Sequence, residues 1–209
     1  MNRPDGFMLA DMDALDADPL VVMTQWLDDA TRYSSRPNPH AAALATCGAD
    51  GQPAARMLLL KGLDHRGAVV YTNLGSDKGR QIEQNPHASL LFHWDRLGRQ
   101  IRIAGGVTIV DDERADAYWS SRPWPSQIGG LASDQSRPLA DRQSLADQVI
   151  EVATQYPLGT KVPRPAHWTG LSVALERVEF WQEGDDRLHD RIVYEATGDG
   201  GWIVSRLWP

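Results

Sequence analysis

The stretch AAALATCGADGQPAARMLLLKG, residues 41–62, contains two apolar runs on either side of a polar turn centred on Asp50 and Gly51. Two short apolar runs joined by an Asp-Gly turn predict a β-hairpin. The segment AVVYTN, residues 68–73, follows the short turn DHRG and predicts a third strand. The chain therefore starts its core with strands that are neighbours in the sequence.

Helical patterns lie on both sides of these strands. The segment DPLVVMTQWLDDATRY, residues 18–33, places Asp18 at a helix N-cap and Pro19 at the first helical position. Its apolar residues recur at helical spacing, as shown by Val22, Trp26 and Leu27. The segment SDKGRQIEQNP, residues 76–86, predicts a short helix that ends before Pro86. We expect one helix before the strands and one after them.

Strand patterns resume beyond Pro86 in ASLLFHW, residues 88–94, and RQIRIAGGVTIV, residues 99–110. The glycine pair Gly105 and Gly106 suggests a β-bulge in the second of these strands. From Asp111 to Tyr156 the pattern is helical, and one face carries Leu145, Val149 and Val152. A second, mainly helical section is therefore expected after the fifth strand.

Three further strands are expected in SVALERVEFWQ, RLHDRIVYE and GWIVSRL, which begin at residues 172, 187 and 201. Short strands flanked by helices indicate an α+β fold that is mainly β, an antiparallel barrel with helical cover. We divide the chain into a flexible N-terminal segment, residues 1–17, and a single domain, residues 18–209. No internal repeat is visible.

The composition excludes several classes of protein. The formal net charge is -7, which disfavours a general binder of nucleic acid or anionic membranes. The one cysteine, Cys47, cannot form an internal disulfide, and the six histidines lack metal-ligand spacing, so we expect no metal. The first residues resemble no signal peptide and no apolar run is long enough to span a membrane. A cytoplasmic protein is expected.

Basic residues stand next to hydroxyl groups at several places. Ser76 and Lys78 fall at a predicted helix N-terminus, where free amides and the helix dipole favour a phosphate. Tyr118, Arg122 and Ser126 recur at helical spacing and could converge on a second phosphate. For each segment alone, a solvated helix face is the simpler interpretation. The chain has no G-x-G-x-x-G, Walker A or H-E-x-x-H motif.

The segment RLHDR, residues 187–191, places Arg187, His189 and Arg191 at alternate positions. If the segment is extended, these side chains share one face of a strand. A solvated edge strand whose charges deter aggregation is the alternative interpretation.

Seven ordered segments resemble the pyridoxine/pyridoxamine 5′-phosphate oxidase family, the FMN-dependent enzymes of the split-barrel flavin-binding fold. The resemblance spans residues 18–209, and its segments are RMLLLKG, YTNLGSDKG, LGRQIRI, SRPWPSQIG, SDQSRP, VEFWQ and RLHDR with RLWP. It implies a homodimer with two FMN molecules at the subunit interface and an active site that draws on both chains.

The resemblance also implies site residues. Lys61, Tyr118, Arg122 and Ser126 would hold the substrate phosphate, and Arg187 and His189 would lie over the substrate ring as the catalytic pair. The FMN contacts would be Arg56, Met57, Leu58, Leu59, Leu60, Lys61, Tyr71, Thr72, Ser76, Lys78, Gln100, Gln135, Ser136, Trp181 and Arg191.

The implied reaction oxidises pyridoxamine or pyridoxine 5′-phosphate to pyridoxal 5′-phosphate, with O2 as electron acceptor and H2O2 as product. Two alternatives stay open: an FMN oxidase acting on a phenazine-type precursor, and a non-catalytic flavin or pyridoxal-phosphate binding protein. The chain departs from the family at Asp77, where a basic residue is common, and at Gly130 and Leu131, where Ala and Trp are frequent. The N-terminal segment also offers no clear equivalent of a lid over the substrate.

Overall fold

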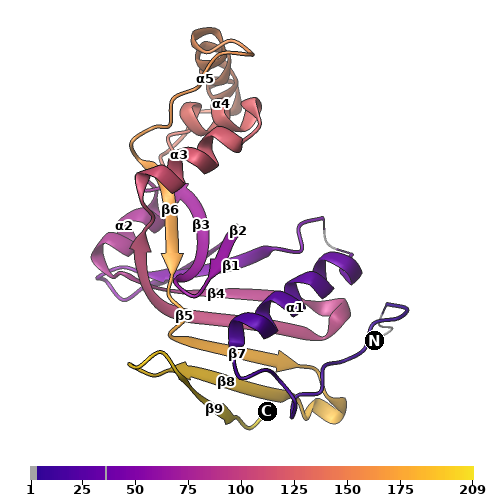
Figure 1. Cartoon of the computed structure of the whole chain (residues 1–209). Coiled ribbons are helices and arrows are strands. Elements are labelled where there is room, and N and C mark those ends of the chain that lie inside the picture. The colour runs from indigo at the N-terminus through magenta and orange to yellow at the C-terminus, as the bar shows by residue number, and fades with distance from the viewer. Residues whose placement is uncertain (1–3, 36) are drawn as a thin grey trace.

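The computed structural model describes residues 4–35 and 37–209. Within these residues nine strands form one antiparallel sheet in the order β4-β1-β2-β3-β6-β5-β7-β8-β9, and β4 also pairs with β5. The second pairing closes the first six strands of this order into a barrel, and β7, β8 and β9 extend it beyond β5 (Figure 1). The strands are β1 Ala41–Cys47, β2 Pro53–Asp64, β3 Gly67–Asn73, β4 His87–Trp94, β5 Arg99–Ile109, β6 Trp168–Val173, β7 Arg177–Gln182, β8 Asp190–Ala196 and β9 Trp202–Arg206.

Five α-helices accompany the strands in the same described part of the chain. They are α1 Pro19–Tyr33, α2 Asp77–Gln84, α3 Asp112–Ser121, α4 Trp124–Ala132 and α5 Arg142–Gln155. The mainly β, antiparallel barrel with helical cover is confirmed. In Figure 1, α1 lies across the sheet, whereas α3, α4 and α5 extend beyond one end of the barrel.

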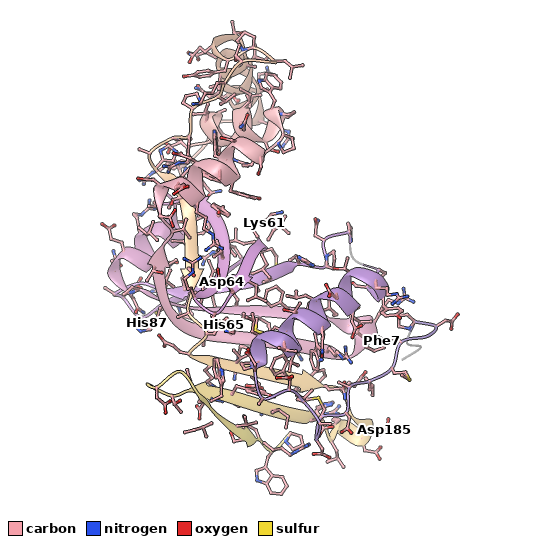
Figure 2. All side chains as sticks on the ribbon, viewed as in Figure 1. Phe7, Lys61, Asp64, His65, His87 and Asp185 are labelled. Carbon is pink, nitrogen blue, oxygen red and sulfur yellow. The ribbon has the colours of Figure 1, made fainter. Side chains whose placement is uncertain are left out.

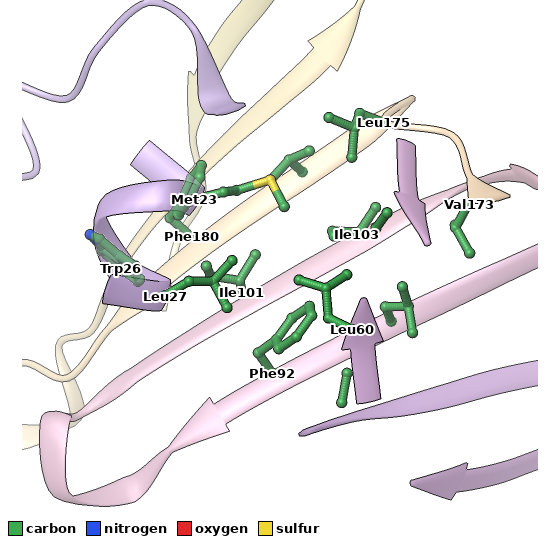
Figure 3. Packing of buried hydrophobic residues seen from close by; sticks show 14 of the residues in the cluster. Met23, Trp26, Leu27, Leu60, Phe92, Ile101, Ile103, Val173, Leu175 and Phe180 are labelled. Atoms are coloured by element: carbon green, nitrogen blue, oxygen red, sulfur yellow. The ribbon is translucent and has the colours of Figure 1, made fainter. Parts of the chain in front are cut away.

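Helix α1 forms where the sequence predicts it and closes the main core. The Asp18 carboxylate accepts a hydrogen bond from the Leu20 amide at 2.9 Å, which caps the helix. Figure 3 shows Trp26 and Leu27 beside Ile101 and Phe180 of the sheet, and the Trp26 and Phe180 rings pack edge to face at 5.2 Å. Burial of this aromatic and aliphatic face fixes the helix on the barrel.

The helices beyond the barrel have a smaller core of their own. It contains Trp119, Ile128, Val152 and Trp168, and the Trp119 indole donates to the Val162 carbonyl at 3.0 Å. Leu145 and Val149 are only half buried, so the predicted face of α5 is buried mainly at Val152.

The bulge predicted at Gly105 and Gly106 is wrong, because β5 keeps an unbroken register with β4 through both residues. Instead, β5 changes its second partner there, from β7 to β6. A Cβ atom on Gly105 would lie 2.2 Å from the Ala174 carbonyl oxygen, so the glycine permits a close approach of two backbones. The register shift occurs in β2, between Leu60 and Gly62.

The segment RLHDR is not extended as predicted. Asp185–Arg187 form a 3-10 turn, with φ values of 52° at Asp186 and 66° at Arg187, and β8 starts only at Asp190. The reason is the hairpin between β7 and β8, which pairs Gln182 with Asp190 and leaves the residues between them to reverse the chain. Arg187 and His189 therefore do not alternate with Arg191 along one strand. The strand predicted from residue 172 is likewise divided between β6 and β7.

The N-terminal segment contacts strands β7 and β8 of the sheet. The backbone amide and carbonyl of Ala10 bond to the Gln182 side chain at 2.9 and 2.8 Å, and the Tyr194 hydroxyl donates to the Asp16 carbonyl at 2.8 Å. Residues 1–3 lie outside the described residues. Flexibility of residues 1–17 stays a prediction.

Candidate active site

The N-terminus of α2 holds a buried ammonium group. Lys78 is 6% exposed, and its Nζ donates to Ser76 Oγ at 2.9 Å and to Gln135 Oε1 at 2.6 Å. Ser76 is fully buried and occupies the N-cap position, but its hydroxyl donates to the Asn73 carbonyl rather than capping the helix. The first amides of α2 therefore remain available beside the ammonium group.

Arg56 of β2 adds a second cation. Its guanidinium donates to the Gln81 side chain at 3.2 Å and to the Leu44 carbonyl at 3.4 Å, and it also contacts the Thr46 hydroxyl. The pKa of Lys78 is lowered to about 8, chiefly by burial and also by the neighbouring charge of Arg56, while the charge of Asp77 opposes the shift. Burial also lowers the pKa of Arg56.

We call Arg56, Ser76, Lys78 and Gln135 the cation cradle. The hydrogen-bond partners that the described residues give its two cations are neutral oxygens. Two close positive charges without carboxylate partners are held at a cost, and an anion placed between them relieves it. The cradle suits a phosphate.

A hollow lies between β2, β3 and the helices beyond the barrel. One cavity of about 270 Å³ is lined by Lys61, Tyr71, Tyr118 and Arg122, together with Met57, Leu58, Leu59 and Trp168. A neighbouring cavity of about 390 Å³ has Leu58, Tyr71, Arg122 and Trp168 in common with it and adds Thr72, Ser126 and Gln135. Because Gln135 also bonds Lys78, the hollow is continuous with the cation cradle. The four residues predicted for one phosphate, Lys61, Tyr118, Arg122 and Ser126, therefore line a single region.

Arg122 has an unusual environment in this hollow. Its guanidinium carbon lies 4.9 Å from the ring centroids of both Trp119 and Trp168. Its Nη1 atom is buried and has no hydrogen-bond partner among the described residues. Burial lowers the pKa of Arg122. A buried donor of this kind is costly unless an anion accepts from it, so Arg122 fits a phosphate ligand.

Aromatic rings and a glycine shape the wall around Arg122. Tyr71 stacks on Tyr118 at 4.0 Å and on Trp168 at 5.2 Å. A Cβ atom on Gly130 would lie 3.1 Å from Arg122 Nη1 and 3.0 Å from the Trp119 ring, so the glycine leaves room for the guanidinium. Gly130, at a position where the family often has Ala, therefore affects the space available to the Arg122 side chain in the pocket.

Strand β2 presents three residues on its outward face. Met57 is 57% exposed and Leu59 37% exposed, and Lys61 is exposed on the same face. These residues lie in a strand that has neighbours on both sides, so exposure of apolar side chains here marks a surface that suits a ligand ring or another chain.

A second group of predicted residues lies around the β7–β8 connection. Gln100, Trp181 and Arg191 are adjacent in register across β5, β7 and β8. The His189 ring lies 4.6 Å from the Trp181 ring, and its Nδ1 accepts from the Gly184 amide at 3.2 Å. The neutral ring therefore carries its proton on Nε2, which has no hydrogen-bond partner in the described part of the chain.

Arg191 and Arg187 differ in their contacts. The Arg191 Nε donates to Glu179 at 2.9 Å, and its Nη1 donates to the Trp208 carbonyl at 3.1 Å. Arg187 is exposed in the 3-10 turn. A cavity of about 470 Å³ beside them is lined by His189, Arg206 and Trp208, with Leu188, Asp190, Leu207 and Pro209.

One chain does not bring the two groups together. The cavity of Lys61 and Arg122 has no lining residue in common with the cavity of His189. Figure 2 shows Lys61 near the helices beyond the barrel, whereas Asp185, in the turn that ends at Arg187, lies at the opposite side of the molecule. Within one chain, Arg187 and His189 therefore lie apart from Lys61 and Arg122.

Sequence reasoning missed three contributors. Trp119 and Trp168 enclose Arg122, and Gln81 joins Arg56 to α2. No local pattern in the sequence distinguishes these two tryptophans, which face a cation, from the others. Ser136, which was predicted, has φ 70° and lines a cavity of about 760 Å³ next to Gln135.

A closed antiparallel barrel with helical cover, a cation cradle and an adjoining aromatic hollow is the architecture of split-barrel flavin-binding proteins. Comparison with solved structures agrees. The structure of PhzG from Burkholderia lata 383 has a TM-score of 0.87 at 32% identity and covers 98% of both chains. An FMN-binding protein related to pyridoxamine 5′-phosphate oxidase, from Nostoc punctiforme, has a TM-score of 0.74 at 17% identity, covers 93% of this chain and all of its own, and supports the fold alone.

The chain belongs to the pyridoxamine 5′-phosphate oxidase family. Residues 28–156 match the family description "Pyridoxamine 5′-phosphate oxidase", and residues 168–209 match "Pyridoxine 5′-phosphate oxidase C-terminal dimerisation region". The pyridoxine/pyridoxamine 5′-phosphate oxidase of Gluconobacter oxydans is 51% identical over 93% of this chain and 96% of its own. That of Novosphingobium aromaticivorans is 50% identical over 92% and 94%.

Proposed function

We propose that this protein is an FMN-dependent oxidase that converts pyridoxamine or pyridoxine 5′-phosphate to pyridoxal 5′-phosphate. The observation that carries the proposal is the pair of neighbouring cation sites, the cation cradle and the pocket of Lys61 and Arg122. Two phosphate sites joined by one hollow fit a phosphorylated cofactor beside a phosphorylated substrate. The close relatives named above bear the name of this activity.

The residues present fit FMN. Arg56, Ser76 and Lys78 would hold its phosphate, and residues 57–60 of β2 with Tyr71 and Thr72 would line its ring and ribityl chain. Gln135 and Ser136 adjoin the cradle. When bound, FMN would supply the redox chemistry, which is hydride acceptance from C4′ of the substrate and reoxidation by O2 with release of H2O2.

The remaining residues would position the substrate. Lys61, Tyr118, Arg122 and Ser126 would fix its phosphate, so that binding energy at the far end orients C4′. Arg187 and His189 would lie over the pyridine ring, where the free Nε2–H of His189 can donate to a ring substituent. Oxidation of the amine substrate would give an imine, which water hydrolyses to the aldehyde and ammonia. Oxidation of the alcohol substrate would give the aldehyde directly.

We infer that the protein acts as a homodimer with a site built from both chains. The match of residues 168–209 to a dimerisation region supports this. So does the separation of Lys61 and Arg122 from the group around His189 in a single chain. Gln100, Trp181 and Arg191 would then meet the flavin bound by the partner chain.

No helix in the described part of the chain is long and apolar enough to cross a membrane. The cytoplasmic location expected from the sequence stays a prediction, as does the absence of nucleic-acid partners.

A related oxidase acting on a phenazine-type substrate is the second candidate, because PhzG, crystallised with tetrahydrophenazine-1-carboxylic acid, has a closely similar fold. The pocket of Lys61 and Arg122 favours the first candidate. The two cations of this pocket and the unpartnered Nη1 of Arg122 suit a dianionic phosphate better than the single carboxylate of that phenazine.

Peroxide release tests the proposal directly. We expect H2O2 from the FMN-loaded protein with pyridoxamine 5′-phosphate and with pyridoxine 5′-phosphate, and far less with unphosphorylated pyridoxamine. The purified protein should be yellow, with an absorbance band near ~450 nm from bound flavin. Equal rates with and without the substrate phosphate would contradict the assignment of the pocket, and a protein that binds no FMN would overturn the oxidase itself.

A further inference from the structure

An acidic residue lies directly beside the cation cradle. Asp77 is the first residue of α2, between Ser76 and Lys78. Its charge acts on both Lys78 and Arg56, which places the carboxylate within electrostatic reach of the two cradle cations. A carboxylate beside a phosphate dianion repels it unless the carboxylate charge is neutralised.

Arg80 pairs with this carboxylate. Its Nη2 contacts Asp77 Oδ1 in an ion pair three residues apart on α2, while its Nη1 donates to the Gly75 carbonyl at 2.6 Å. Arg80 therefore joins the Asp77 side chain to the loop that precedes the helix. The side chains of Asp77 and Arg80 are 59% and 38% exposed, whereas Ser76 and Lys78 are buried. The Asp77–Arg80 pair thus lies on the outer side of the cradle.

The pair changes the charge that an incoming phosphate meets. The ion pair with Arg80 offsets part of the Asp77 charge, so less of that charge opposes the attraction of Arg56 and Lys78 for an anion. Without Arg80, one of the two cradle charges is offset by the carboxylate. The Gly75 contact also holds the loop whose Ser76 hydroxyl accepts from Lys78.

We propose that Arg80 is a positioning residue for FMN: it neutralises Asp77 and turns that carboxylate away from the cofactor phosphate, which allows this chain to bind FMN with an acidic residue in the cradle loop. The inference rests on the proposed function, since it concerns the same cofactor. Arg80 acts through Asp77 and not by contact with FMN.

A double-mutant cycle on the full-length apoprotein tests this. Flavin fluorescence quenching gives the dissociation constants of FMN and of riboflavin, which lacks the phosphate. We expect Arg80→Ala to weaken FMN binding about tenfold and to leave riboflavin binding unchanged. Asp77→Asn in the Arg80→Ala background should restore FMN affinity to within about twofold of the parent, and Arg80→Lys should retain most of it.

Two further measurements sharpen the cycle. The loss in Arg80→Ala should shrink as salt is raised, because it is an exposed electrostatic effect. Arg66→Ala, which removes an exposed arginine from the surface pair with Asp64, is the matched control and should bind FMN like the parent. Circular dichroism and thermal unfolding establish that each variant is folded.

The outcomes separate the two proposals. If the parent binds FMN and Arg80→Ala binds it equally well, the role of Arg80 is wrong and the oxidase assignment stands. If Asp77→Asn fails to rescue Arg80→Ala, Arg80 contacts the phosphate itself and the proposed mechanism is wrong. A parent protein that binds no FMN overturns both the role of Arg80 and the proposed function.

Discussion

Replacing Arg122 with Ala is expected to raise the KM for pyridoxamine 5′-phosphate by about 10- to 100-fold while kcat falls much less. A charge-assisted hydrogen bond of this kind contributes about 1.5–3 kcal/mol. Arg122 would hold the phosphate in both the ground state and the transition state, so its loss removes uniform binding and chiefly affects KM. Steady-state peroxide assays over a range of substrate concentrations measure both constants.

The structure supplies a control for this variant. Arg142 is an exposed arginine at the start of α5, in the same group of helices but outside the hollow. Arg142→Ala should leave KM unchanged. FMN affinity should also be retained in Arg122→Ala, because the cation cradle is intact. An unchanged KM would remove Arg122 from the substrate phosphate site.

Replacing Lys78 with Met is expected to weaken FMN binding by about 100-fold or more. Truncating one partner of a buried charge pair costs about 2–5 kcal/mol, much of it from leaving the other charge unpaired. Met keeps the length of the side chain and removes the buried ammonium group, so the apoprotein should still fold. Fluorescence titration of FMN measures the loss, and Lys161→Met, at an exposed lysine, is the control.

The pH dependence of FMN binding follows from the same residue. The pKa of Lys78 is about 8 in the protein without FMN, and a bound phosphate favours the protonated form. FMN affinity should therefore fall as the pH rises through about 8 and beyond, and this loss should be absent in Lys78→Met. The contribution of Lys78 to the folding stability of the apoprotein changes in the opposite direction. Because the folded pKa of Lys78 lies below the ordinary value of 10.5, this contribution becomes more favourable as the pH rises from about 8 towards 10.5. FMN affinity that is flat in pH would contradict a charged Lys78 in the cradle.

Local patterns predicted most elements of the fold. The cap at Asp18, the turn at Gly51 and the helix that ends before Pro86 each depend on neighbouring residues, and each appears where expected. The turn at Asp185–Arg187 was missed because its conformation follows from the pairing of β7 with β8, which is a tertiary constraint. The partner change of β5 at Gly105 has the same origin.

The site was predictable in its residue types but not in its geometry. Tyr118, Arg122 and Ser126 line one hollow with Lys61, as predicted, but not by continuous helical spacing. Helix α3 ends at Ser121, Arg122 is its extended C-cap, and Ser126 lies in α4. Spacing could not reveal that Trp168, more than forty residues away, covers the Arg122 guanidinium. It also could not place Arg187, which lies in a turn that the pairing of β7 with β8 sets.

Mixing two impaired variants at a substrate concentration below the parent KM tests the account most directly, because the central claim is that the site forms between chains. Arg122→Ala and Arg187→Ala each damage both sites of a homodimer. If each site takes Arg122 from one chain and Arg187 from the other, a mixed dimer contains one intact site and one doubly altered site. Under these conditions Arg122→Ala alone has little activity, and an equal mixture that is unfolded and refolded should recover about a quarter of the parent peroxide activity. If both residues act from the same chain, every site in the mixed dimer carries one substitution, and the mixture would be no more active than the two variants separately.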